Sequence, residues 1–250
     1  MKTGYLLLSL ILILVIYSYW YVKNTEKTKD EIKDFSLNVQ KEQPINMIED
    51  QPIGFGYKCI WFAVKTTDKE RVSKIIGLKK QMPSNWEYGI KRAYENSIFI
   101  SPEIQGWTFV VGWGLPDGSS TSSMSEVTTL LNALSKEFGE AQFYVSHRVV
   151  EYHGWIKSWE GQIVRSYFYL GEQVKNIEIF GEATEVEKGY KLVNTFSKEA
   201  QHDSYWDRED LTYPDEELVM RIADSWSIDP SKLEEYKGSN GLGILGVRQR

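Results

Sequence analysis

The stretch HRVVEYHGWIKSWEGQIVRSYFY, residues 147–169, decides the fold class. It is rich in β-branched and aromatic residues, and the Glu-Gly pair at 160–161 is a turn signal between two strand-like halves. Further strand-like runs flank it at 141–150 and 174–180, with a second turn signal at 171–172. Runs of this kind joined by short turns predict β-hairpins. We therefore expect consecutive hairpin strands of a mainly antiparallel sheet.

Helix signals lie on both sides of these strands. Capping boxes at Thr67 with Glu70, and at Ser123 with Glu126, each precede an apolar stripe at helical spacing that a glycine ends. A last helix is predicted with Pro214 in its first turn. Its apolar face holds Val219, Ile222, Ala223 and Trp226.

The order of these elements predicts an α+β domain. A strand at 58–66 and a hairpin at 97–102 and 106–114 complete a β-α-β-β-α-β order, which is the ferredoxin-like, or split βαβ, pattern. We expect hairpins to extend this core and helices to cover one face of the sheet. The domain is predicted over residues 53–236, and residues 237–250 are predicted to be a flexible tail.

Residues 5–22 form an uncharged apolar run that ends in Tyr19, Trp20 and Tyr21. As a helix it would be about 27 Å long, close to the thickness of a bilayer's hydrocarbon core. A cleaved signal peptide is the alternative, but no small-residue cleavage site follows. We expect a single-pass anchor in the cell membrane and a charged linker over residues 23–52. Lysines after the run favour a cytoplasmic domain and the short N-terminal tail favours the other side, so both orientations stay open.

Charge and motifs exclude several functions. The net charge of −6 argues against nucleic acid as a partner, because phosphate contacts need a basic face. The single cysteine, Cys59, cannot form an internal disulfide. The sequence has no phosphate-binding loop, dinucleotide fingerprint, Gly-x-Ser-x-Gly elbow or His-Glu-x-x-His motif. No cofactor is therefore expected.

A metal site is one hypothesis for the histidines. His147 and His153 would need a third ligand, such as Glu151 or His202. Along one unbroken strand the two histidines would lie about 20 Å apart, so only a bend between them would let them share an ion. We expect no metal and interpret both histidines as structural.

Catalysis is the alternative function. Glu151, His153 and Glu160 flank one predicted strand and could face a common cleft. Paired carboxylates can cleave glycosidic bonds when their separation suits the mechanism. The alternative prediction is therefore a hydrolase or glycan-processing enzyme that uses these three residues.

The aromatic residues are the stronger signal. Trp155, Lys157 and Trp159 alternate onto one face of a predicted strand, which is unusual for a dry core. With Arg148 and Arg165 they could form an exposed platform, and tryptophan and arginine dominate the binding energy of many protein interfaces. We expect this face to bind a partner, and the alternative is that each ring covers the core or the helix-free face of the sheet.

The segments SPEIQGWTFVVG, LSKEFGEAQFYVSHRVVEYHGWIKSWEGQIVRSYFY and ADSWSIDPSKL carry a family resemblance. They resemble a family of uncharacterised bacterial proteins with a Gly-Trp strand, a Leu-Ser-x-x-Phe-Gly helix end and a His-Arg-Val strand. The resemblance covers roughly residues 57–235 and implies no activity. We predict a membrane-anchored bacterial protein that binds another protein, with immunity-type protection as one form of such binding.

Overall fold

The computed structural model describes residues 48–236 and 241–248. The predicted anchor and most of the predicted linker lie outside these residues. Among the helices that the structure describes, none combines the length and apolar character needed to cross a membrane.

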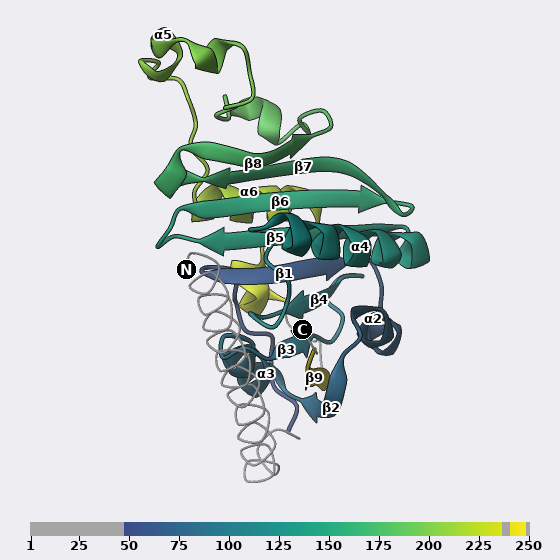
Figure 1. The fold of residues 1–250 in the computed structure, drawn as a ribbon. Helices are drawn as coiled ribbons and strands as arrows, with labels where there is room; N and C mark the ends of the chain where they lie inside the picture. Colours follow the sequence, from purple (N-terminus) through teal and green to yellow (C-terminus); the bar gives the residue numbers. More distant parts are fainter. Residues whose placement is uncertain (1–47, 237–240, 249–250) are drawn as a thin grey trace, which may run out of the picture. The chain divides into compact units, whose positions relative to one another are not determined.

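One sheet organises the described part of the chain. Its strands pair antiparallel throughout, in the order β2-β9-β3-β4-β1-β5-β6-β7-β8 (Figure 1). The predicted α+β class with a mainly antiparallel sheet is confirmed. The strands are β1 (Cys59–Val64), β2 (Lys79–Ser84), β3 (Ile98–Ile100), β4 (Thr108–Val111), β5 (Glu140–His147), β6 (Tyr152–Trp159), β7 (Gln162–Leu170), β8 (Lys175–Phe180) and β9 (Gly243–Val247).

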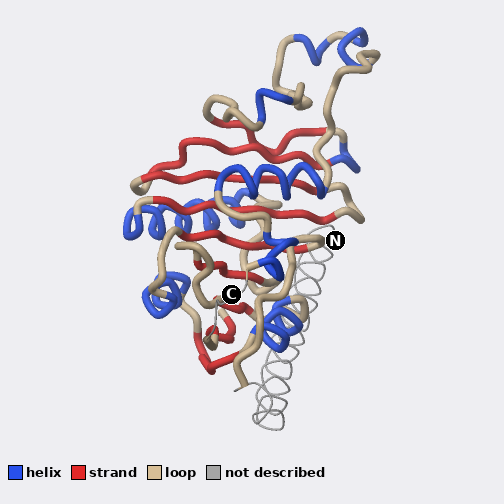
Figure 2. Tube along the Cα trace, turned by 180° about the vertical axis from the view of Figure 1, so that it is seen from behind, coloured by secondary structure: helices blue, strands red, loops and turns tan. Residues whose placement is uncertain are grey.

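Helices cover both faces of the sheet, so the expectation of helices on one face is wrong (Figures 1 and 2). α2 (Lys69–Ile76) and α4 (Thr121–Phe138) pack on one face, whereas α3 (Trp86–Ala93) and α6 (Glu216–Trp226) pack on the other. The reason lies in β1, which is buried at every position. Trp61 belongs to one apolar cluster and its neighbour Phe62 to the other. A strand that is apolar on both sides needs cover on both sides.

The predicted capping boxes lie close to the observed caps but use other residues. Asp68, not Thr67, caps α2, and its carboxylate accepts a hydrogen bond of 2.8 Å from the Arg71 N–H. Ser120 caps α4, and the Ser123 hydroxyl instead accepts hydrogen bonds from backbone N–H groups of the preceding loop. The N-cap hydrogen bond needs an acceptor just before the first helical turn, and several residues here supply one.

The predicted flexible tail is wrong for residues 243–247, which form β9 between β2 and β3. Leu245 is fully buried there. A Cβ atom on Gly246 would lie 2.6 Å from the Lys79 carbonyl oxygen, so glycine allows the strands to approach. The predicted linker also ends earlier than residue 52, because the Asp50 carboxylate accepts hydrogen bonds from the first N–H groups of α3. The folded domain therefore extends beyond residues 53–236 at both ends.

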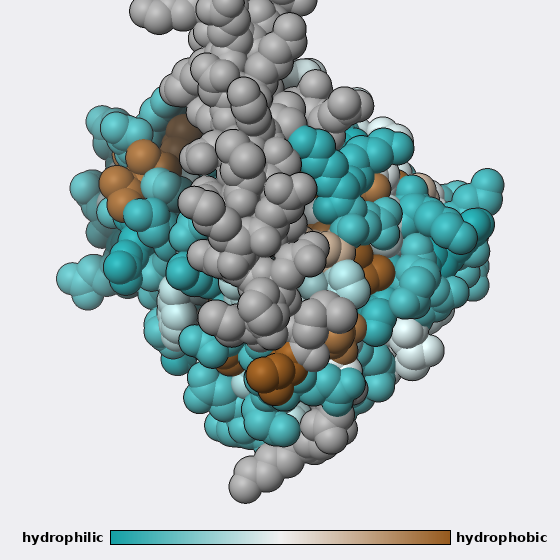
Figure 3. Space-filling model, turned by 90° about the horizontal axis from the view of Figure 1, so that it is seen from below, coloured by the Kyte–Doolittle hydropathy of each residue, from teal (hydrophilic) through white to brown (hydrophobic). Residues whose placement is uncertain are grey.

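The sheet has one edge at β2, which carries Lys79, Lys80 and Pro83. Lysine and proline on an edge strand disfavour pairing with another chain. From below, the visible described surface is mostly hydrophilic, with apolar residues in small groups (Figure 3).

Beyond β8, at the other edge, the chain runs through three short helical segments before it returns to α6. These are η2 (Glu187–Gly189), η3 (Glu199–Gln201) and α5 (Asp203–Trp206). Two further 3₁₀ segments are η1 (Gly171–Gln173) and η4 (Pro230–Glu235). The return of the chain at residues 213–217 brings this segment back to the start of β6.

Candidate functional site

The predicted aromatic platform does not form, because Trp155 is buried in the core. Its ring stacks on Tyr167 with centroids 4.8 Å apart, and its Nε1–H donates a 2.9 Å hydrogen bond to Glu187 Oε1. The segment after β8 and helix α6 cover this face of β6, which local sequence does not reveal. The prediction of an exposed Trp155 is wrong.

Arg165 is also buried, and it forms an ion pair with Glu187 at 2.6 Å. Its guanidinium group donates further hydrogen bonds to the carbonyl oxygens of Phe180 and Gly181. Burial acts to raise the pKa of Glu187, but hydrogen bonds from Arg165 and Thr184 outweigh it and hold the pKa below its usual value. Arg165 therefore ties the segment after β8 to the sheet and has no exposed group for a partner.

Lys157 and Trp159 keep some exposure. The Lys157 amine lies 2.8 Å from a Glu140 carboxylate oxygen and 5.5 Å from the centre of the Trp226 ring. Trp159 is exposed at the end of β6. Glu160 follows it in the β6–β7 turn, at the opposite end of β6 from Glu151 and His153. Of the predicted binding residues on β6 and β7, only Trp159 presents a large exposed surface.

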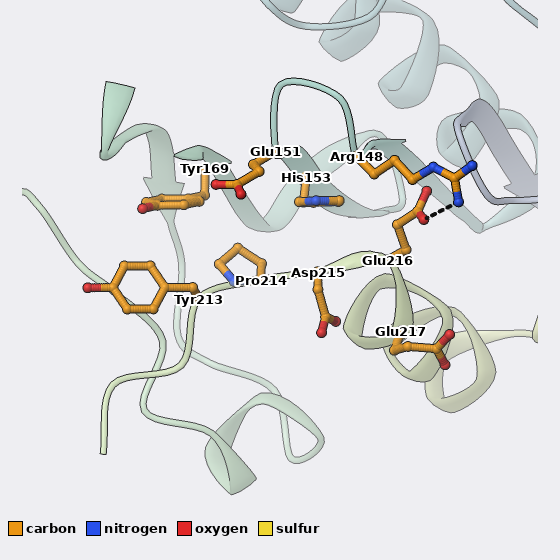
Figure 4. A pocket seen from close by; sticks show the side chains of 9 residues that line it. All are labelled: Arg148, Glu151, His153, Tyr169, Tyr213, Pro214, Asp215, Glu216 and Glu217. Carbon is orange, nitrogen blue, oxygen red and sulfur yellow. Dashed lines mark ion pairs between the residues drawn. The ribbon is translucent and has the colours of Figure 1, made fainter. Parts of the chain in front are cut away.

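Three predicted residues, Arg148, Glu151 and His153, do meet at an open cavity of about 420 Å³ (Figure 4). They come from the β5–β6 turn and the start of β6. Glu160 does not join them. The remaining lining residues are Tyr169, Tyr213, Pro214, Asp215, Glu216 and Glu217. We call these nine residues the β6–α6 pocket.

One end of the pocket is a satisfied polar network. Glu216 accepts hydrogen bonds from the Lys58 N–H at 3.0 Å and the Ser146 hydroxyl at 3.2 Å. Its other carboxylate oxygen lies 3.7 Å from the Arg148 guanidinium group. Glu217 accepts a 2.9 Å hydrogen bond from the Tyr57 hydroxyl. The two carboxylates at this end therefore have partners, whereas the Arg148 side chain is 69% exposed.

His153 lines the middle of the pocket and is only 3% exposed. Burial lowers its pKa, against the opposing effect of Glu216 and Asp215, so the ring is neutral at pH 7. Nδ1 lies 3.4 Å from the Ser146 hydroxyl oxygen. Because Ser146 donates its proton to Glu216, Nδ1 must carry the hydrogen and donate it to Ser146. Nε2 is then left as a hydrogen-bond acceptor.

The other end of the pocket is aromatic and acidic. Tyr169 and Tyr213 meet edge to face with ring centroids 5.9 Å apart. Burial, together with Tyr213 and Glu151, raises the pKa of Tyr169 to about 12. The Glu151 carboxylate lies over Gly171, where a Cβ atom would collide with it. Within residues 48–236 and 241–248, no hydrogen bond or ion pair engages this carboxylate.

The two histidines of the metal hypothesis lie on opposite faces of the sheet. The turn between β5 and β6 brings them to adjacent register positions, so the 20 Å separation expected for one unbroken strand does not apply. His147 packs against Trp113 at a centroid distance of 5.4 Å, whereas His153 contacts Ser146 on the pocket side. No cluster of three potential metal ligands occurs in the part of the chain that the structure describes.

The acids at 215–217 are recognisable in the sequence as residues that complement the positive end of a helix. Nothing local indicates that they face the β5–β6 turn, because about 60 residues separate the two. Comparison with protein-family models, curated proteins and solved structures gives no match.

Proposed function

We propose that this chain is a binding protein that holds a protein partner over the β6–α6 pocket. The observation that carries the proposal is a set of exposed apolar side chains that belong to, or directly adjoin, residues lining the polar cavity. Val149 in the β5–β6 turn is 69% exposed, Tyr213 is 46% exposed, and Tyr57, bonded to Glu217, is 39% exposed. Apolar and aromatic side chains beside a concave polar site favour contact with another protein. An immunity-type protective interaction is one form that this binding would take.

Site-specific photo-crosslinking tests the proposal. Benzoylphenylalanine would replace Val149 in the full chain, expressed in its own cells, and Val164 at the far end of the hairpin would serve as the exposed control. We expect one discrete crosslinked protein from position 149 that is absent from position 164. The same product should disappear when Tyr213→Ala is added. Equal products from both positions, or none from position 149, would overturn the proposal.

A hydrolase is the second candidate, and one observation favours it. Glu151 and the neutral His153 line the same pocket, and a neutral imidazole with a free Nε2 can act as a general base. A mechanism with Glu151 and Glu160 as paired carboxylates does not fit, because Glu160 lies at the other end of β6. Turnover of ester or glycoside substrates that His153→Gln abolishes, with the fold intact, would favour the enzyme over the binding protein.

We also propose that residues 5–22 anchor the protein in a bacterial cell membrane, as the uncharged run suggests. The resemblance of residues 57–235 to a bacterial family is also part of this proposal.

We further propose that β3, β4, β1 and β5 form a ferredoxin-like core. The order of these four strands, with β1 between β4 and β5, supports that assignment.

A further inference from the structure

We infer that the β6–α6 pocket receives an arginine side chain of the partner. This inference rests on the proposed binding function and specifies which chemical group enters the site. It follows from the free polar atoms of the pocket, from its charge and from its aromatic wall.

Away from Arg148, three acceptor groups of the pocket remain free, beside the hydroxyl groups of Tyr169 and Tyr213. His153 Nε2 is one, since Ser146 fixes the hydrogen on Nδ1. The Glu151 carboxylate is a second. Asp215 uses Oδ1 to cap α6, through a 2.8 Å hydrogen bond from the Leu218 N–H, and its other oxygen is a third. A ligand that satisfies such a set must be rich in donors, and guanidinium carries five N–H donors and no acceptor.

His153 adds a neutral hydrogen-bond acceptor to the acidic side chains of the pocket. The side chain is almost fully buried, yet it lines the cavity together with Pro214 and Asp215 (Figure 4). Because the ring borders the open cavity, a ligand N–H group that enters the pocket can donate a hydrogen bond to Nε2.

Charge and shape select a cation with a flat face. Four carboxylates line the pocket against the single guanidinium of Arg148, which already pairs with Glu216 at the opposite end from Glu151 (Figure 4). Tyr169 and Tyr213 form a wall beside Glu151. Guanidinium stacks on aromatic rings and binds carboxylates through a planar fork, whereas the lysine ammonium is a compact, strongly hydrated point charge.

The experiment uses the full chain in detergent, with its three histidines labelled with carbon-13 at the ring. The probes are three capped peptides, acetyl-Gly-X-Gly-amide, in which X is arginine, citrulline or lysine. We expect the arginine peptide to shift the His153 ring signal saturably. Citrulline has the same shape without the charge, and it should bind at least about tenfold more weakly, as should lysine.

Matched variants separate contact from net charge. Glu151→Gln should weaken arginine binding about threefold to tenfold, as expected for one partly exposed ion pair. Glu172→Gln removes the same charge from a neighbouring exposed position that does not line the pocket, and it should leave the affinity unchanged. Equal affinity for citrulline and arginine, or equal effects of both variants, would overturn the inference.

The two proposals fail in different ways. If the Val149 crosslink persists but the arginine peptide does not shift His153, the binding function stands and the arginine inference is wrong. If the peptide binds and no crosslinked protein forms, the protein-binding function is wrong and the pocket serves a smaller guanidinium ligand.

Discussion

Trp155 and Trp159 lie four residues apart on β6, but one is enclosed and the other is exposed. Trp155→Ala removes a buried ring, its stack on Tyr167 and its hydrogen bond to Glu187. We expect it to lower the free energy of unfolding by about 3–5 kcal/mol. Trp159→Ala should cost about 1 kcal/mol or less. Urea unfolding of the two variants measures both values, and similar losses at both positions would contradict the observed burial.

His153 predicts a pH dependence of stability. Its folded-state pKa lies below the usual 6.5, chiefly because of burial. As pH falls below about 6.5, the unfolded chain takes up the proton before the folded chain does, so stability decreases until pH passes the folded pKa. Glu216 and Asp215 reduce the size of this effect, and His147 adds to it.

Urea midpoints between pH 7.5 and 5.0 test this expectation. The midpoint of the wild-type chain should fall with pH over that range, and His153→Gln should flatten the profile. His202→Gln, at an exposed position, is the control and should leave the slope unchanged. A wild-type profile that is flat, or that rises toward pH 5, would contradict the burial argument.

At the scale of elements, β9 carries the clearest consequence. It lies between β2 and β3 and hydrogen-bonds to both, so its removal would leave two unpaired edges and uncover the apolar side chains beneath. A chain that ends at Tyr236 should lose more than about 2 kcal/mol of stability, because burial of Leu245 alone contributes on that scale.

Thermal and urea unfolding of the truncated chain measure this loss. A chain that lacks only residues 249–250 is the matched control and should unfold like the full protein. An unchanged midpoint after truncation at Tyr236 would show that β9 is dispensable.

At the scale of the whole molecule, the prediction concerns the membrane. Residues 5–22 have no charged side chain, and transfer of such a segment into a bilayer is favourable. We expect the full chain to stay in the membrane pellet after washes with high salt and with alkaline carbonate. A chain without residues 1–22 should appear in the soluble fraction, and release of the full chain by salt would contradict the anchor.

Local sequence determined the helices and strands whose apolar residues recur at regular spacing. The apolar run of β1, the alternation in β5 to β8 and the amphipathic stripes of α4 and α6 depend on neighbouring residues, so their positions are predictable. The closeness of Arg148, Glu151 and His153 to one another also follows from local sequence, because one short turn joins β5 to β6.

Only the tertiary structure decided which segments meet across long separations. β9 has a short apolar sequence with two glycines. Its place in the sheet depends on the strand edges of β2 and β3, which lie about 150 residues earlier in the sequence. Trp155 and Arg165 became core residues because the Glu187 segment folds over them. The Asp215–Glu217 acids reach His153 through the packing of α6 on the sheet. Burial and unpaired hydrogen-bonding groups select these contacts over the whole chain, and no local pattern encodes that selection.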